Sequence, residues 1–231
     1  MQLFYEPNFS SSYNYLNPEE SNHCVKVLRK KNGDEIRVTN GQGKIFTCTL
    51  KVANPKKCEL TIITEEDQLK ASGYFHLAIA PTKNNDRMEW LVEKCTEIGI
   101  DEITFFYAQN SERTKFKIDR SLKKSIAAMK QSLAAFLPII NEPVDFSNLI
   151  KECDAEQKFI AHFLPENNDL HKQLIPQRSC LILIGPEGDF SEKEIQIAAD
   201  QNFNTINLGK SRLRTETAGL VACHTYSLVS R

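Results

Sequence analysis

The stretch that decides the fold is CLILIGPEGDFSEKEI, residues 180–195. It opens with an apolar run, 180–184, that has the composition of a buried strand. A turn containing Gly185 and Gly188 follows, and Ser191 with Glu194 forms a capping box at the start of a helix. Strand, tight turn and capped helix are the repeating parts of an α/β domain with a mostly parallel sheet.

The same alternation extends on both sides of this stretch. Further strands are predicted at 74–80, 102–107, 158–163 and 205–208, and helices near 86–98, 147–153, 192–202 and 215–229. The helix near 86–98 should end at Gly99. A long helix from about 119 should carry four apolar residues on one face and end before Pro138: Leu122, Ile126, Met129 and Leu133. In such a sheet, ligands bind at the carboxyl ends of the strands.

The first third of the chain has a different pattern. Asn17-Pro18 marks a helix start, and strands are predicted at 35–39, 44–52 and 58–64, with Asn40-Gly41 as a hairpin turn. Short strands without long helices between them indicate a small barrel or sandwich. The polar stretch 65–73 is the predicted boundary between domains at residues 1–70 and 71–231.

Composition places the chain among intracellular globular proteins. The 41% hydrophobic and 26% charged fractions are ordinary for a folded domain. The seven cysteines are scattered and never form a CxxC pair, which argues against a disulfide framework or a zinc site. No apolar run is long enough for a membrane span, and no secretion signal is visible. We therefore expect a cytoplasmic protein without a metal.

The net charge of −1 conceals two basic clusters. Residues 24–57 hold nine Lys and Arg against two acids, and residues 111–131 hold seven against two. Dense local clusters on a neutral protein suit contact with a polyanion such as RNA. A solvated surface explains the same clusters about equally well, so charge alone leaves both interpretations open.

A second strand-to-helix turn, LGKSRLRTETA, occupies residues 208–218. Gly209-Lys210-Ser211 suggests a phosphate loop, but the earlier glycine of that signature is Asn204 here, so the signature fails. Arg212 and Arg214 precede the helix start at Thr215, where anionic groups are readily bound. Taken alone, either turn could be structural only.

Together, GPEGxFSxxE and LGxxxLRxETA resemble the SPOUT methyltransferases, and specifically the RsmE family of 16S rRNA uracil-N3 methyltransferases. The resemblance covers essentially the whole chain and includes these further positions: His23, Val27, Leu28, Arg29, Gly33, Asp34, Gly41, Gly43, Lys83, Arg87, Met88, Glu89, Lys94, Glu97, Gly99, Arg113 and Thr114. Two departures stand out. Residues 129–135 lack the family's charged positions, at Lys130, Ala134 and Ala135, and Asp189 replaces a common glycine.

The resemblance implies an N-terminal PUA-like β-barrel for RNA binding and a C-terminal SPOUT domain with a deep trefoil knot that holds S-adenosylmethionine. It also implies a homodimer whose active site uses both subunits. The implied cofactor contacts are Ile184, Gly185, Pro186, Gly188, Leu208, Gly209, Arg212, Leu213, Thr217 and Ala218.

The implied reaction methylates N3 of a uridine in 16S rRNA of the small ribosomal subunit. Arg214, and then Arg113, are the candidates for stabilising charge on the base, and Glu187 and Glu216 for accepting its proton or orienting an arginine. Expected RNA contacts are His23, Arg29, Lys30, Lys31, Arg37, Lys83 and Arg87. The alternative is a catalytically inactive RNA-binding or ribosome-assembly protein of the same fold; a different target nucleotide is a third possibility.

Overall fold

The computed structural model describes residues 2–162 and 168–230. The chain folds into two compact units, one of Met1–Lys70 with Ile126–Leu137 and one of Ala71–Ser125 with Pro138–Arg231. The division falls inside helix α3 (Asp119–Gln131), whose last residues belong to the smaller unit. Within the described ranges, no helix has the length and apolar character needed to cross a bilayer.

The smaller unit is built on a four-stranded sheet in the order β1-β2-β3-β4. Its strands are β1 (Leu3–Tyr5), β2 (Glu35–Thr39), β3 (Lys44–Val52) and β4 (Glu59–Asp67). β2 and β3 form the predicted antiparallel hairpin with the predicted bounds, whereas β4 continues past the expected end at residue 64. β1, which is parallel to β2, was too short for its apolar pattern to be recognised.

The predicted N-terminal helix is present but changes character halfway. Asn17 caps α1 (Pro18–Asn22) by accepting the Glu20 backbone N–H at 2.9 Å. A π-helical turn, η1 (His23–Val27), then closes with the Leu28 N–H donating to the His23 carbonyl at 3.0 Å. Such wider turns occur mostly as single turns and often at functional sites.

The larger unit contains a six-stranded sheet in the order β10-β8-β9-β5-β6-β7. Its strands are β5 (Phe75–Ile79), β6 (Glu102–Tyr107), β7 (Ile139–Asp145), β8 (Gln157–Ala161), β9 (Cys180–Ile184) and β10 (Asn204–Ile206). Every pairing described in this sheet is parallel, which confirms the predicted α/β class. β7 was missed because it is an edge strand that tolerates Asn141, Glu142 and Pro143.

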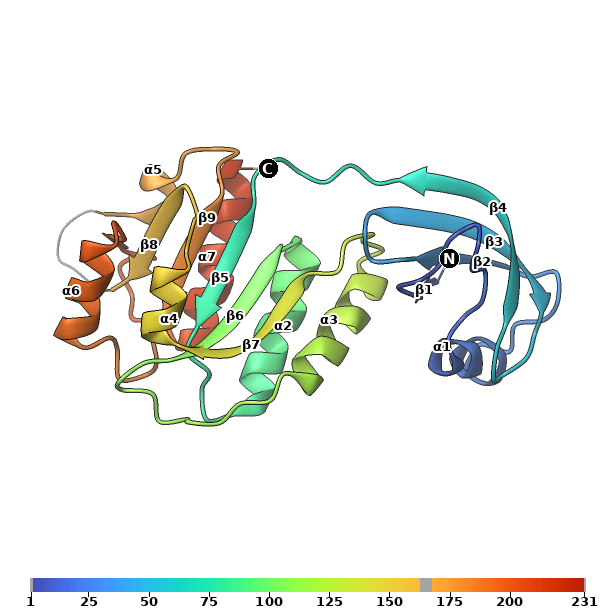
Figure 1. The fold of residues 1–231 in the computed structure, drawn as a ribbon, viewed down its shortest axis with the longest axis horizontal. Coiled ribbons are helices and arrows are strands. Elements are labelled where there is room, and N and C mark those ends of the chain that lie inside the picture. Colours follow the sequence, from blue (N-terminus) through green and yellow to red (C-terminus); the bar gives the residue numbers. More distant parts are fainter. Residues whose placement is uncertain (1, 163–167, 231) are drawn as a thin grey trace. The chain divides into compact units, whose positions relative to one another are not determined.

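Helices cover both faces of this sheet (Figure 1). α2 (Asn85–Ile98) and α7 (Thr215–Ser230) pack on one face, and α4 (Phe146–Lys151) and α6 (Glu192–Asp200) on the other, while α5 (Leu170–Gln173) is a single short turn. Successive side chains of β5 point to opposite faces of the sheet and pack into the hydrophobic core on each face. Leu77 and Ile79 face α7, and Ala78 faces the α4 side.

The predicted ends of α2 and α3 have different outcomes. α2 stops where predicted, at Gly99 with φ of 93°. Leu133 was expected on the apolar face of α3, and this is wrong: α3 ends at Gln131, and Leu133 has φ of 57° and is 41% exposed. The chain turns there because the next residues pair with the hairpin of the smaller unit, Gly43 N–H donating to the Ala135 carbonyl.

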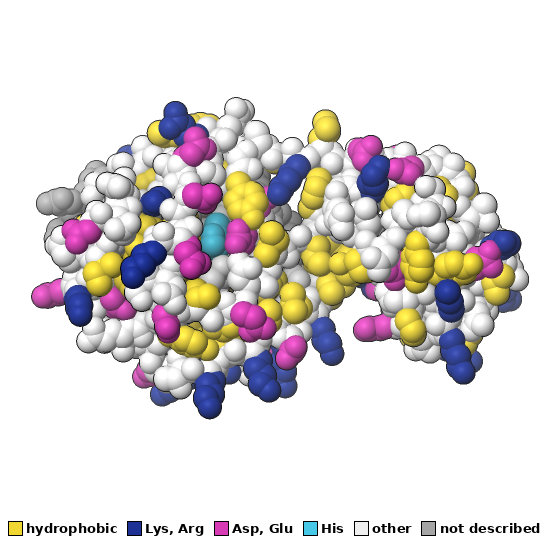
Figure 2. Space-filling view, viewed as in Figure 1, with side chains coloured by type: hydrophobic (Ala, Val, Ile, Leu, Met, Phe, Trp, Pro, Cys, Tyr) yellow, Lys and Arg dark blue, Asp and Glu magenta, His cyan; other side chains and the backbone are white. Residues whose placement is uncertain are grey.

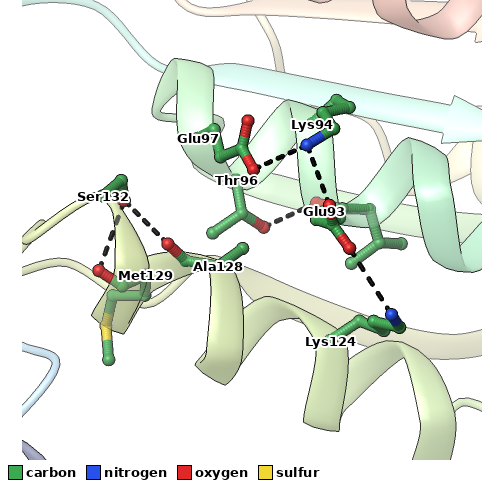
Figure 3. A network of polar contacts seen from close by, with 9 residues as sticks. Glu93, Lys94, Thr96, Glu97, Lys124, Ala128, Met129 and Ser132 are labelled. Atoms are coloured by element: carbon green, nitrogen blue, oxygen red, sulfur yellow. Dashed lines mark hydrogen bonds and ion pairs between the residues drawn. The ribbon is translucent and has the colours of Figure 1, made fainter.

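Ion pairs fix the first half of α3 against α2 (Figure 3). Glu93 of α2 pairs with Lys124 of α3 at 3.4 Å and with Lys94 at 2.8 Å. These partly exposed pairs are weak individually, on the order of 0–1 kcal/mol each.

Candidate functional site

A cavity of the larger unit lies where β8, β9 and β10 end. It has a volume of about 750 Å³, within the usual range for a site that encloses a small organic ligand. Three strand-terminal residues contribute to it, Ala161, Ile184 and Ile206. Parallel strands direct their carboxyl ends to one edge, so the loops that follow them meet at the same place.

The first turn of the cavity, after β9, is held tightly. A Cβ on Gly185 would lie 2.9 Å from the Phe190 ring, so only glycine fits there. Asp189 adopts φ of 62°, a left-handed conformation that is uncommon outside glycine. Its carboxylate accepts the Phe190 N–H at 2.7 Å and lies 3.0 Å from His162 Nδ1. The predicted capping box of Ser191 and Glu194 is present and starts α6.

The second turn, after β10, leads into α7. Gly209 has φ of 122°, and a Cβ at this position would meet nothing within 4 Å, so backbone conformation rather than space requires glycine. Arg212 and Arg214 are exposed and both line the cavity. The Arg214 carbonyl accepts the Ala218 N–H at 2.8 Å, which places this arginine at the N-terminus of α7.

Glu216, the second residue of α7, is buried at the edge of this cavity. Its Oε1 lies 3.6 Å from Nε of Arg87 on α2. Its Oε2 is shielded from solvent and has no hydrogen-bond partner among residues 2–162 and 168–230. The two residues were predicted from separate motifs, and packing of α2 against α7 brings them together.

Next to the cavity, backbone contacts hold Arg113 in place. Its guanidinium donates to the carbonyls of Thr82 at 3.1 Å, Lys83 at 3.3 Å and Lys115 at 2.8 Å. Lys83 pairs with Glu112 at 2.8 Å, and that contact, with a smaller contribution from the nearby Glu187, raises the pKa of Lys83. The loops after β5 and β6 thus place Lys83 near Glu187 and hold Arg113 against the backbone of Lys83.

The cavity gathers most of the predicted cofactor and catalytic residues. Those that line it are Ile184, Gly185, Pro186, Glu187, Leu208, Gly209, Arg212, Leu213, Arg214, Glu216 and Ala218. Arg87, which was predicted to contact RNA, lines the cavity as well. Gly188, Thr217 and Arg113 lie outside the lining, although Gly188 belongs to the same turn. Sequence reasoning missed His162 and Asp189; His162 directly follows β8, so the position of that strand's carboxyl end could have indicated it.

The N-terminal residues predicted to contact RNA all lie in the smaller unit. Arg29, with φ of 55°, and Lys31 are exposed, whereas Lys30 donates to the Glu35 carbonyl at 3.3 Å. His23 lies 3.0 Å from the side-chain amide of Gln2 and contacts the edge of Phe4, and Arg37 on β2 is partly buried.

The segment that departs from the family pattern is used for packing. Lys130 pairs with Glu20 within the smaller unit, and Ala135 is buried there beside Leu3 and Ile45. In the larger unit, Figure 2 shows Lys and Arg side chains gathered along the edge near α2 and α3. Exposed basic residues of this region are Lys115, Lys117, Arg120 and Lys123.

These features define a ligand-binding α/β protein with a cationic rim. The family described as RNA methyltransferase domain matches residues 70–227, and the RNA methyltransferase PUA domain matches residues 16–63. The chain therefore belongs to the RNA methyltransferase family.

Individual relatives match over nearly the whole chain. Ribosomal RNA small subunit methyltransferase E of Mesomycoplasma hyopneumoniae (strain 232) is 32% identical over 205 residues, covering 86% of this chain and 87% of that protein. A crystal structure named "probable rRNA-methyltransferase from Porphyromonas gingivalis" is 38% identical, with a TM-score of 0.91 and 99% of each chain covered. The Neisseria gonorrhoeae methyltransferase E bound to S-adenosylmethionine is 26% identical, with a TM-score of 0.87 over 100% of this chain and 98% of that one.

Proposed function

We propose that this protein transfers a methyl group from S-adenosylmethionine to N3 of a uridine in 16S rRNA of the small ribosomal subunit. The observation that carries the proposal is the cavity at the ends of β8, β9 and β10, where both glycine-containing turns and two exposed arginines meet. The Neisseria gonorrhoeae relative, which has the same fold, is bound to this cofactor.

The residues around the cavity fit S-adenosylmethionine, which supplies a methyl group on a positively charged sulfonium. Ile184 and Ile206 are buried apolar wall residues, and Leu208 and Leu213 continue the wall toward solvent. Gly209, where a Cβ would meet nothing within 4 Å, leaves its backbone open to a ligand, whereas at Gly185 the missing side chain makes room for the Phe190 ring. Apolar walls with a few directed polar groups are what an adenosine moiety requires. Gly188 and Thr217 lie outside the lining of the cavity.

Charged side chains of the protein then help uracil N3 to lose its proton. N3 becomes nucleophilic as its proton leaves, and the resulting charge spreads onto the flanking carbonyl oxygens. Arg214 lines the cavity and is exposed to an incoming base, so it stabilises that charge, with Arg113 as the second cation. Glu187, exposed in the first turn, is the candidate proton acceptor. Much of the rate comes from alignment of base and methyl donor.

RNA binding involves both units. Residues 1–70 form the PUA-like domain, in which His23, Arg29, Lys30, Lys31 and Arg37 contact RNA, and residues 71–231 form the SPOUT domain except for residues 126–137, which pack with the smaller unit. In the larger unit, the proposed RNA contacts are Lys83 and the exposed basic residues near α3. We further propose a cytoplasmic homodimer with a knotted C-terminal domain, an active site that uses both subunits and no requirement for a metal. Among the described residues, no group of His, Cys, Asp and Glu is arranged to hold one.

Two measurements test the function. Calorimetry should show that the purified protein binds S-adenosylmethionine, and mass mapping of 16S rRNA should find one methylated uridine that disappears when the gene is deleted and returns with the wild-type gene. An inactive assembly protein would give no heat with the cofactor and no change in the RNA. The altered segment 129–135 no longer favours that alternative, because two of its changed positions, Lys130 and Ala135, make packing contacts within the smaller unit.

A further inference from the structure

Arg87 and Glu216 form an ion pair that is too long for a hydrogen bond and leaves one carboxylate oxygen of Glu216 without a partner in the described structure. Their closest atoms, Nε and Oε1, lie 3.6 Å apart, within range of charge attraction but longer than a charge-assisted hydrogen bond. The second oxygen of Glu216 has no hydrogen-bond partner within the described part of the chain. The Glu216 side chain is only 9% exposed, so bulk solvent has little access to this carboxylate.

A buried carboxylate with an unpaired oxygen destabilises the folded protein unless a bound ligand donates a hydrogen bond to that oxygen. Leaving a buried charged acceptor unsatisfied costs more than the pair itself returns. The N-terminus of α7 compensates part of the charge, because its backbone N–H groups attract an anion. It provides no donor to Oε2. The terminal torsion of a glutamate is soft, so either oxygen can turn toward a donor in the cavity.

We propose that Arg87 and Glu216 together bind the amino-acid end of S-adenosylmethionine, Glu216 accepting its ammonium and Arg87 its carboxylate. The inference rests on the proposed function and assigns part of the same cavity. An α-amino acid carries one cation and one anion on the same carbon, and the pair offers the opposite charges side by side at the cavity wall. Both residues then gain the hydrogen bonds that they lack.

The unpaired oxygen of Glu216 needs a hydrogen-bond donor, and this need distinguishes the amino-acid end of the cofactor from the sulfonium and from an RNA phosphate. The sulfonium has no N–H or O–H to donate, whereas the ammonium has three N–H groups. If Arg87 instead bound an RNA phosphate, Glu216 would lose its only counter-ion in the described structure and remain buried. The amino-acid end is therefore the part of the cofactor that satisfies both residues at once.

Calorimetry with three ligands tests the proposal without measuring activity. S-Adenosylmethionine and S-adenosylhomocysteine carry the amino-acid end, and methylthioadenosine lacks it. Glu216→Gln should weaken binding of the first two by about tenfold or more, the scale of one charge-assisted contact, and leave methylthioadenosine unchanged. Arg87→Gln, a change at a partly exposed side chain, should show the same selectivity.

Glu192→Gln is the matched control. Glu192 is also an acid in the first turn of a helix, α6, but it is exposed and lies outside the cavity lining. This variant should bind all three ligands as the wild type does. Retained methylthioadenosine binding by Glu216→Gln would show in the same experiment that the cavity is still folded.

Each other result overturns the inference. Equal weakening of all three ligands would make the pair a structural support, and weakening of S-adenosylmethionine alone would place Glu216 beside the sulfonium. Unchanged binding with lost methylation would make Glu216 part of the proton transfer. If the wild-type protein binds none of the ligands, the proposed function itself fails, which is a different outcome from a wild type that binds and a variant that does not discriminate.

Discussion

Gly185, Asp189 and Gly209 shape the two turns of the cavity for different physical reasons. A side chain at Gly185 would collide with Phe190, whereas at Gly209 the space is open and the backbone angle is the constraint. Asp189 keeps a left-handed conformation although it is not a glycine. Its carboxylate contacts to Phe190 and His162 offset a strain of roughly 1–3 kcal/mol. The constraint is thus steric at Gly185 and conformational at Gly209 and Asp189.

Arg214→Ala should lower the methylation rate by at least about 100-fold, the scale of losing one donor that stabilises developing charge. The exposed side chain contributes little to packing, so folding should be retained. Single-turnover methylation of 16S rRNA measures the effect, with thermal unfolding as the check on folding. Lys193→Ala, at an exposed residue of α6 outside the cavity lining, is the control and should retain most activity. Wild-type turnover by Arg214→Ala would remove this arginine from the mechanism.

Among the elements, α7 connects the site to the core. Its first turn carries Thr215 and Glu216 at the cavity, and its middle packs on β5 and α2. Gly219 allows this close approach, because a Cβ there would lie 3.0 Å from Ile79 and 3.1 Å from Leu91. A glycine inside a helix costs about 1 kcal/mol relative to alanine, so its presence reflects the contact rather than helix propensity.

Gly219→Val should therefore lower the free energy of unfolding of the larger unit by about 1–3 kcal/mol, the usual cost of overpacking a tight interface. Trp90, the single tryptophan, lies on α2 and reports this unit in urea denaturation followed by fluorescence. Leu228→Ala on the same helix is the control, because Leu228 is 71% exposed; it should change stability by less than about 0.5 kcal/mol. An unchanged midpoint for Gly219→Val would show that α7 can move away without cost.

For the molecule as a whole, a partly buried histidine couples stability to pH. His76 on β5 lies 2.7 Å from the Thr104 hydroxyl and 3.7 Å from Glu102. Burial lowers its pKa, and the nearby Glu102 opposes this only in part. The unfolded chain, in which a histidine titrates near about 6.5, therefore binds a proton more readily than the folded protein.

Above about pH 6.5, protonation of His76 takes nothing from the free energy of unfolding. As the pH falls toward the lower folded pKa of His76, the unfolded chain binds the proton first and the free energy of unfolding decreases. Between about pH 7.5 and pH 5.5, the wild type should lose more unfolding free energy than His76→Gln, by at most about 1.4 kcal/mol. Urea denaturation of both proteins at the two pH values, followed by Trp90 fluorescence, measures this difference. Parallel pH dependences would mean that His76 does not carry the effect.

Sequence patterns predicted the elements that depend on local signals. They missed the features that depend on contacts between distant segments of the chain. The bounds of β2, β3, β6 and β9 match the predicted strands, and Gly99 ends α2 as its position indicates. Leu133 was misplaced because pairing with the hairpin of the smaller unit overrides the helical spacing. In the cavity, the contiguous turns were predicted as units, whereas His162 and Asp189 gained their importance only through contact with each other.

The sequence by itself determined the alternation of strands and helices, the two glycine-containing turns and the capped helix starts, because each depends on residues that are neighbours in the chain. Only the tertiary structure decided the strand order β10-β8-β9-β5-β6-β7 and the meeting of Arg87 with Glu216. The physical reason is that contacts between remote segments depend on which strands pair and which helix faces pack. Local propensity and hydrophobic period leave that choice open.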